Sequence, residues 1–317
     1  MKKHIIITVV LLVIGIAMCA VGGVICGAGD GFAFKRDLEY TEHTFEAESD
    51  IKAIDFELKG NYNFIIQSGE SCSLKYSESE ISDISVVESN GALKVVEKTH
   101  WTNFIQSWFA KTQKTDLVLT VIEGTVLTMD CEFDGAVTME LPAWEYGNIN
   151  FDVNGAAQIK TAGEIKTEDV EFDVSGYGEL SMSGEFKDVE VATSGGSNVS
   201  LQGSATSLKI SASGSSAFKS EDLKCDNVSI KASGSVEANI KGEGGTLTAR
   251  MSGSCRIYAA EFTLSTAEIR VSGSVRADVN VSDKIIVNAS GSAKINYYGD
   301  PQIEKTVSGG VKINKIG

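Results

Sequence analysis

VSGSV at residues 271–275 is one copy of a short phrase that returns throughout residues 126–317. Its glycine, Gly273, belongs to a series that begins at Gly135 and ends at Gly309. Successive glycines of the series lie 18 to 21 residues apart. A nearly fixed period of this size is typical of repeated supersecondary units that stack on one another, because one unit alone cannot bury its apolar face.

Residues on both sides of each glycine alternate between apolar and polar. After Gly273, for example, the apolar positions are Val275, Ala277 and Val279. Period-two alternation predicts strands with one buried face. Each unit is therefore predicted to consist of a strand, a glycine turn, a second strand and a second turn.

If the same position of each unit lies over the next, the units pair in parallel about 4.8 Å apart, with right-handed crossovers. The predicted fold class is all-β, a parallel β-helix or solenoid of about 19–20 residues per coil. Glycine suits the corner because positive φ costs it little. A serine precedes the glycine in eight consecutive repeats, from Ser175 to Ser308. We interpret these serines as corner residues whose hydroxyls bond the local backbone or one another.

The beginning of the chain predicts one transmembrane helix ahead of the repeats, in a signal anchor over residues 1–29. Lys2 and Lys3 precede an uncharged apolar run over residues 5–26, which is long enough to span a bilayer. The two lysines favour a cytoplasmic N-terminus. The predicted location is thus the cell membrane, single-pass, with the C-terminal domain extracytoplasmic. A cleaved signal peptide is the alternative, because small residues follow the run.

Between the anchor and the repeats, residues 30–44 are predicted to be a linker and residues 45–125 an N-terminal β region of early or capping coils. In this region Asn90-Gly91 joins two alternating runs, which predicts a hairpin. The repeats then occupy residues 126–317.

A short amphipathic helix is predicted near residue 105. Trp101, Phe104, Trp108 and Phe109 fall on one stripe of it. The stripe would either cover the end of the stack or contact a partner or membrane surface.

The composition suits an external domain. The chain has 28 basic and 43 acidic residues, a net charge of −15, which argues against nucleic-acid binding. Four cysteines follow the apolar run, at Cys72, Cys131, Cys225 and Cys255, and they fall at different phases of the repeat. We expect buried free thiols rather than disulfides.

No catalytic residue, cofactor or metal site is predicted. The three histidines, His4, His43 and His100, lie outside the repeats. The regular spacing leaves no room for the long insertions that form clefts in polysaccharide-active β-helix enzymes. Asp152 and Asp173 are expected to stack as a solvated acidic strip rather than to hold a cation.

Outward positions three residues before and three residues after the glycine become basic toward the C-terminus. Six residues make up this cationic strip: Lys231, Arg250, Arg256, Arg270, Arg276 and Lys294. Stacked cations about 5 Å apart repel one another unless acids or a ligand intervene. The hypothesis is that the strip contacts an anionic cell-wall polymer or glycan, and scattered solvated charges are the alternative.

Several segments together resemble a known family. The apolar N-terminal run, the segment DIKAIDFELKGNYNFII at 50–66, the serial SGS repeats and the closing YYGDP at 297–301 are similar to bacterial putative-adhesin domains of head-GIN type, which are of unknown function. The resemblance covers the chain from about residue 45 to its end. It implies an extracytoplasmic β-helix, often membrane-tethered, and it supplies no catalytic residue.

The predicted function is that of a non-catalytic cell-envelope surface protein with a structural, adhesive or envelope-sensing role. One alternative is a polysaccharide-active lyase or hydrolase, which would need a deep groove with paired carboxylates. The other is an accessory protein of a membrane signalling system, whose residues 5–26 would contact partners in the membrane.

Overall fold

The structure is a computed structural model that describes residues 36–99, 110–111 and 113–316. These residues contain strands and turns but no helix. The strands are β1 (Arg36–Asp37), β2 (Tyr40–Glu46), β3 (Ala53–Leu58), β4 (Asn61–Gly69), β5 (Ser73–Ser79), β6 (Ser82–Ser89), β7 (Ala92–Thr99), β8 (Ala110–Lys111), β9 (Lys114–Ile122), β10 (Leu127–Leu141), β11 (Tyr146–Tyr298), β12 (Gln302–Gly309) and β13 (Lys312–Lys315).

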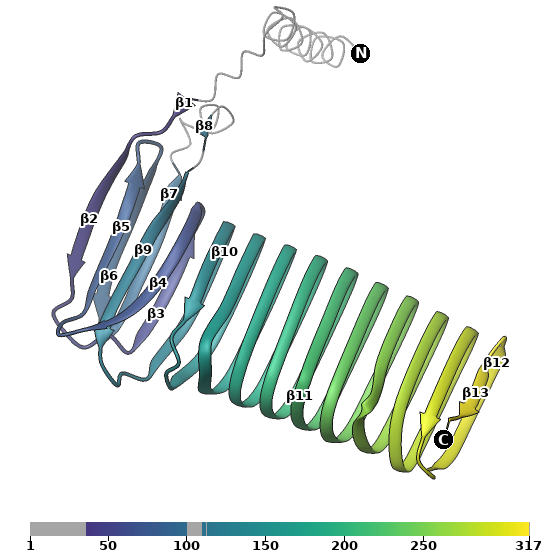
Figure 1. The fold of residues 1–317 in the computed structure, drawn as a ribbon. Helices are drawn as coiled ribbons and strands as arrows, with labels where there is room; N and C mark the ends of the chain where they lie inside the picture. The colour runs from purple at the N-terminus through teal and green to yellow at the C-terminus, as the bar shows by residue number, and fades with distance from the viewer. Residues whose placement is uncertain (1–35, 100–109, 112, 317) are drawn as a thin grey trace, which may run out of the picture.

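The repeats form one very long strand that winds around a common axis. Strand β11 continues without interruption for 153 residues, turn after turn (Figure 1). It pairs in parallel with β10, with Gly155 opposite Gly135 and Ile159 opposite Met139. The predicted parallel register of one repeat is therefore confirmed at this pairing.

The glycines of the series bend the winding strand through positive φ values. Gly155 has a φ of 146°, and a Cβ added to it would lie 2.1 Å from the carbonyl oxygen of Gly135. No side chain fits in that space. Because the backbone bends at glycine without a separate turn, the hydrogen-bonded ladder passes through the corner unbroken.

The N-terminal end combines parallel and antiparallel pairing. Strands β3 and β4 pair with the two halves of β10, and β7 and β9 pair in parallel with β3 and β4. Strands β7 and β9 thus form the outermost turn. Antiparallel strands cover it, with β6 on β7, β5 on β9 and β2 on β5. The predicted hairpin is confirmed, since Asn90 and Gly91 join β6 to β7 with φ of 53° and 74°.

The structure corrects the predicted fold class. A parallel β-helix, or solenoid, of separate strands and turns was expected, whereas the sheet is nearly closed and barrel-like. The reason is the bend at glycine, which keeps each turn of β11 extended and within the ladder. The antiparallel pairing of β2 with β5 and of β5 with β9 is a second departure from the prediction.

Two further predictions concern helices. The anchor over residues 5–26 and the stripe of Trp101, Phe104, Trp108 and Phe109 both lie outside the described residues. In the part of the chain that the structure describes, no helix is long and apolar enough to cross a membrane.

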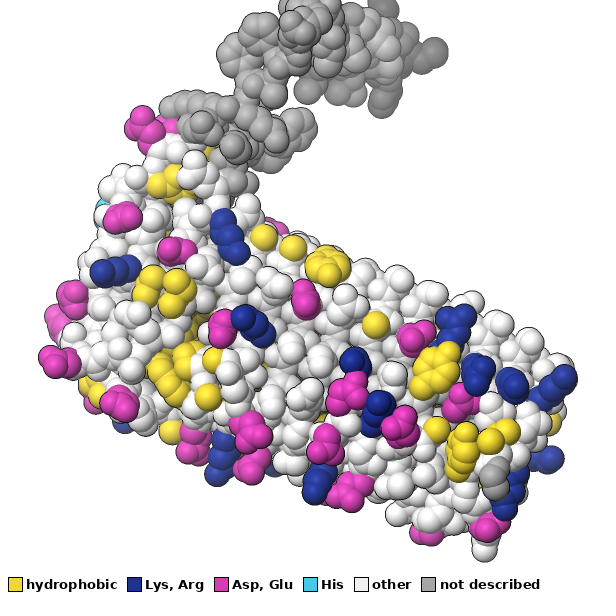
Figure 2. All heavy atoms as spheres, in the orientation of Figure 1, with side chains coloured by type: hydrophobic (Ala, Val, Ile, Leu, Met, Phe, Trp, Pro, Cys, Tyr) yellow, Lys and Arg dark blue, Asp and Glu magenta, His cyan; other side chains and the backbone are white. Residues whose placement is uncertain are grey.

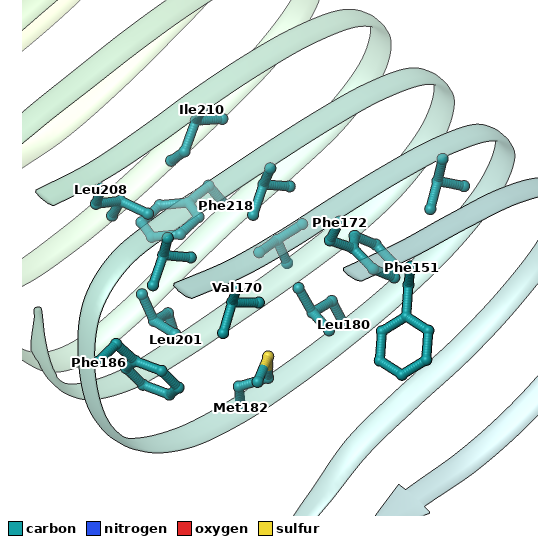
Figure 3. Close-up of a cluster of buried hydrophobic side chains, with 14 of the residues drawn as sticks. Phe151, Val170, Phe172, Leu180, Met182, Phe186, Leu201, Leu208, Ile210 and Phe218 are labelled. Carbon is teal, nitrogen blue, oxygen red and sulfur yellow. The ribbon is translucent and has the colours of Figure 1, made fainter. Parts of the chain in front are cut away.

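Inward-facing side chains form one continuous apolar core along the axis. Phe151, Phe172, Leu180 and Met182 belong to it (Figure 3), and none of the four is more than 3% exposed. Burial of each side chain of this size contributes about 1.5–3 kcal/mol. Each turn shares this contribution with its neighbours. The thiols of Cys72, Cys131, Cys225 and Cys255 are buried and free, as predicted.

Candidate functional site

Four cationic side chains from successive turns line one groove near the C-terminal end. They are Arg256, Arg276, Lys294 and Lys312, each three residues after a glycine of the series. All four are exposed, and the groove has a volume of about 410 Å³. Figure 2 shows Lys and Arg side chains close together over the C-terminal turns. We call this feature the basic groove.

Three serines line the basic groove beside the cations. Ser254, Ser274 and Ser292 each follow a glycine directly and precede a cation by two residues. Their hydroxyls are exposed and make no hydrogen bond within the described residues. These serines were not among the predicted site residues, although the pattern Ser-x-Arg or Ser-x-Lys recurs in three consecutive repeats of the sequence.

The serines before the glycines do not form the predicted ladder. Within the described chain, no hydroxyl from Ser175 to Ser308 at this position bonds the backbone or another serine. Two earlier residues that also precede a glycine of the series do bond each other, since the Asn154 amide donates to Asp134 at 3.2 Å. The serine hydroxyls are thus available to solvent or a ligand.

Arg276 is the most firmly held cation of the groove. Its Nε and Nη2 donate to Oδ2 of Asp278 at 3.0 and 2.9 Å, and its guanidinium lies 5.7 Å from the centre of the Tyr258 ring. Asp278 is only 8% exposed and also accepts from the Asn296 amide at 2.5 Å. Hydrogen bonding to Asp278 raises the pKa of Arg276 further above its usual value, so the guanidinium stays charged.

The other cations of the basic groove have weaker partners or none. Nη1 of Arg256 is 3.9 Å from a carboxylate oxygen of Glu237. Within the described chain, Lys294 and Lys312 form no ion pair. Two of the four cations of the groove therefore have no carboxylate partner among the described residues.

The structure places the remaining members of the predicted strip on the other side of the glycine corner. Lys231 and Arg250 line a second groove together with Asp173, and Arg250 and Arg270 line a third. Arg270 forms an ion pair with Glu268. The six predicted residues thus lie on two ridges, and only Arg256, Arg276 and Lys294 share the basic groove.

The acidic positions earlier in the chain lie close enough to interact. Partial burial and then the charges of Asp152 and Glu190 raise the pKa of Asp173. The described residues nevertheless contain no group of three or more His, Cys, Asp or Glu side chains that could hold a metal ion.

Chains of similar length are among the solved structures that match this chain. A putative adhesin from Parabacteroides merdae is 14% identical, with a TM-score of 0.43, over 88% of this chain and 97% of the other. A putative adhesin from Parabacteroides distasonis gives the same four values. A putative lipid binding protein from the latter organism is 18% identical, with a TM-score of 0.40, over 89% of this chain and 100% of the other.

No curated protein matches the chain. A family model does match, over residues 52–241 and 232–301, and its description is "Putative auto-transporter adhesin, head GIN domain". These two segments cover more than half of the sequence. The chain therefore belongs to the family of putative auto-transporter adhesins with a head GIN domain.

Proposed function

We propose that this protein is a non-catalytic surface protein that binds a linear polyanion of the cell envelope in its basic groove. The observation that carries the proposal is the alignment of Arg256, Arg276, Lys294 and Lys312 along one groove. Membership of a family described as putative adhesins supports a role in binding at the cell surface.

The chemistry of the basic groove suits repeated anionic groups. Guanidinium and ammonium groups bind phosphate and carboxylate, and free serine hydroxyls add neutral donors between them. Adjacent turns are about 4.8 Å apart, so the cations form a row. A row of cations recognises several charges of one linear polymer better than it recognises a single small anion.

The charge of the rest of the molecule restricts where a polyanion can bind. The net charge of −15 repels polyanions from most of the surface. Electrostatic attraction of a polyanion is thereby confined to the turns that carry the basic groove. This attraction is expected to weaken with added salt.

The lining of the basic groove also supports a binding role rather than catalysis. Its described residues include three serines but no histidine or carboxylate that could act as a base toward them. A nucleophilic serine without a base is a weak catalyst, whereas its hydroxyl remains a good hydrogen-bond donor.

The proposal is tested by retention of the full chain on immobilised polyanions. Polyglycerol phosphate presents phosphodiesters, polygalacturonate presents carboxylates, and neutral dextran and duplex DNA serve as comparisons. The triple variant Arg256→Ser, Lys294→Ser, Lys312→Ser retains Arg276, because that residue compensates the buried Asp278.

We expect the triple variant to bind at least about tenfold more weakly to one of the two envelope-type polymers, since each exposed charge contact contributes a fraction of a kcal/mol to about 1 kcal/mol. The matched control, Lys52→Ser, Lys75→Ser, Lys187→Ser, changes the net charge equally and should bind like the unmodified chain. Equal losses in both variants, absence of retention, or a preference for DNA would overturn the proposal.

A further inference from the structure

The outermost turn carries a carboxylate at a position that is apolar in the neighbouring turns. Val153, Phe133 and Leu58 form one inward-facing column, because they are partners in the parallel register. The register of β3 with β7 ends at Glu57 opposite Val96, and Glu97 is the next residue of β7, so we place it beside Leu58 in this column. Its side chain is buried, with only 7% exposed. A residue that breaks the local pattern in this way is expected at functional sites.

The second half of the outermost turn departs from the pattern as well. Val137 and Tyr62 are register partners in an inward column, and Tyr62 is paired in turn with Thr115. The glycine column also stops here. Gly60 lies against Gly135, but the sequence between the end of β7 at Thr99 and the start of β9 at Lys114 contains no glycine. The outermost turn therefore lacks a glycine corner.

A cavity of about 270 Å³ lies beside Gly60. Its lining includes Glu97 and the rings of Tyr40 and Tyr62. Hydroxyl and amide groups come from the ends of four strands and the residue before β9. Among them are Ser77, Thr115 and Gln113. The lining thus combines polar groups with aromatic and aliphatic side chains such as Leu38 and Ile81.

Glu97 has one carboxylate oxygen engaged and one open. The Tyr62 hydroxyl donates to Oε2 at 2.7 Å, and the backbone N–H of Lys59 donates to the same atom at 2.8 Å. Oε1 accepts no hydrogen bond from the described residues. Burial, and then the charge of Glu97, raise the pKa of Tyr62, so its hydroxyl remains a donor. Because Glu97 lines the cavity, Oε1 can accept a hydrogen bond from a donor bound there.

We propose that this cavity binds a neutral sugar unit, one hydroxyl of which donates to Oε1 of Glu97. Groups such as the Ser77 hydroxyl and the Gln113 amide both donate and accept, as several adjacent sugar hydroxyls require. The volume suits one small unit rather than a chain.

Other ligand classes fit the cavity less well. Glu97 and Asp134 outnumber Lys59 among the charged lining residues, which disfavours an anion. A metal ion would require several oxygen ligands around one point, and the described residues provide no such group. The strands that line the cavity lie at the opposite end of the molecule from the C-terminal turns that carry the basic groove (Figure 1), so the two proposals stand or fail independently.

The experiment measures binding of glucose, galactose and N-acetylglucosamine to the full chain by saturation-transfer NMR and calorimetry. Ser77→Trp fills the cavity, and Glu97→Gln removes the charged acceptor. Ser85→Trp, on the exposed face of β6, is the matched control for the added ring. Thermal unfolding of each variant shows whether the fold is retained.

We expect at least one sugar to bind, with binding lost in Ser77→Trp, retained in Ser85→Trp and weakened about tenfold or more in Glu97→Gln. That factor is the effect of replacing a charged acceptor by a neutral one. If Glu97→Gln does not fold, Ser77→Trp alone decides. The proposal is overturned if no sugar binds or if binding persists in Ser77→Trp. It is also overturned if a folded Glu97→Gln binds sugar as well as the unmodified chain does, or if the small cation ethanolamine binds while the sugars do not.

Discussion

Lys294 lies directly beside Lys312 on the neighbouring strand, because the two are register partners between β11 and β13. Neither side chain forms an ion pair within the described residues. Like charges on directly adjacent strand positions destabilise a sheet. Stability alone therefore does not explain the pair, whereas a polyanion between the two ammonium groups would.

Replacing Lys294 and Lys312 with serine should separate binding from stability. We expect unchanged or slightly higher resistance to denaturant, because a repulsion is removed. Binding to polyglycerol phosphate should weaken, and the slope of log affinity against log salt should fall by about one for each lysine removed. Lys305→Ser in the same terminal turn is the control, since Lys305 does not line the basic groove. An identical slope for the control and the groove variants would contradict the prediction.

Arg276 and Asp278 should behave as a coupled pair in stability. Arg276→Ser leaves the buried Asp278 carboxylate without its cation, so we expect a clear loss of unfolding free energy. Adding Asp278→Asn should recover much of that loss, and a double-mutant cycle by urea unfolding measures the coupling. Arg256→Ser, whose partner Glu237 is exposed at 3.9 Å, should cost less. Additive effects of the two changes at 276 and 278 would show that the pair is not coupled.

The parallel register could be predicted from the sequence, but the shape of the sheet could not. Register follows from the spacing of Gly135 and Gly155, because each glycine must lie against the one before it. Alternation shows only that a side chain faces inward. The same pattern arises whether a strand ends in a turn or bends through glycine, so the nearly closed sheet was not predicted.

The site was predictable only in part for a related reason. Arg250 lies three residues before Gly253 and Arg256 three residues after it. This equal spacing does not show that the two side chains line different grooves. Glu97 was not among the predicted site residues. It is the last residue of the alternating run that follows Asn90-Gly91, and it was interpreted as one of the polar residues of that run. Its place two residues after the inward-facing Val95 was the available signal.

Two adjacent glycines allow a controlled test of the corner. A Cβ on Gly195, where φ is 131°, would lie 2.1 Å from the carbonyl oxygen of Gly176, whereas the nearest atom to a Cβ on Gly196 is 3.8 Å away. We expect Gly195→Ala to lower the free energy of unfolding by at least about 2 kcal/mol. Gly196→Ala should change it by less than about 1 kcal/mol, in either direction. Similar effects of the two variants in urea unfolding would refute the account of the corner.

Asp173 should make stability depend on pH in the acidic range. Partial burial and the charges of Asp152 and Glu190 raise its pKa above the usual value of 3.8, so ionisation is less favourable in the folded chain than in the unfolded chain. The stabilisation from its protonated form is complete below 3.8 and is lost as the pH rises through the raised pKa. Asp173→Asn should therefore stabilise the protein at neutral pH, and this gain should disappear well below pH 3.8. Urea unfolding across the acidic range checks both limits, with Asp188→Asn as a control for the lost negative charge. A gain that is the same at every pH would mean that ionisation of Asp173 is not its cause.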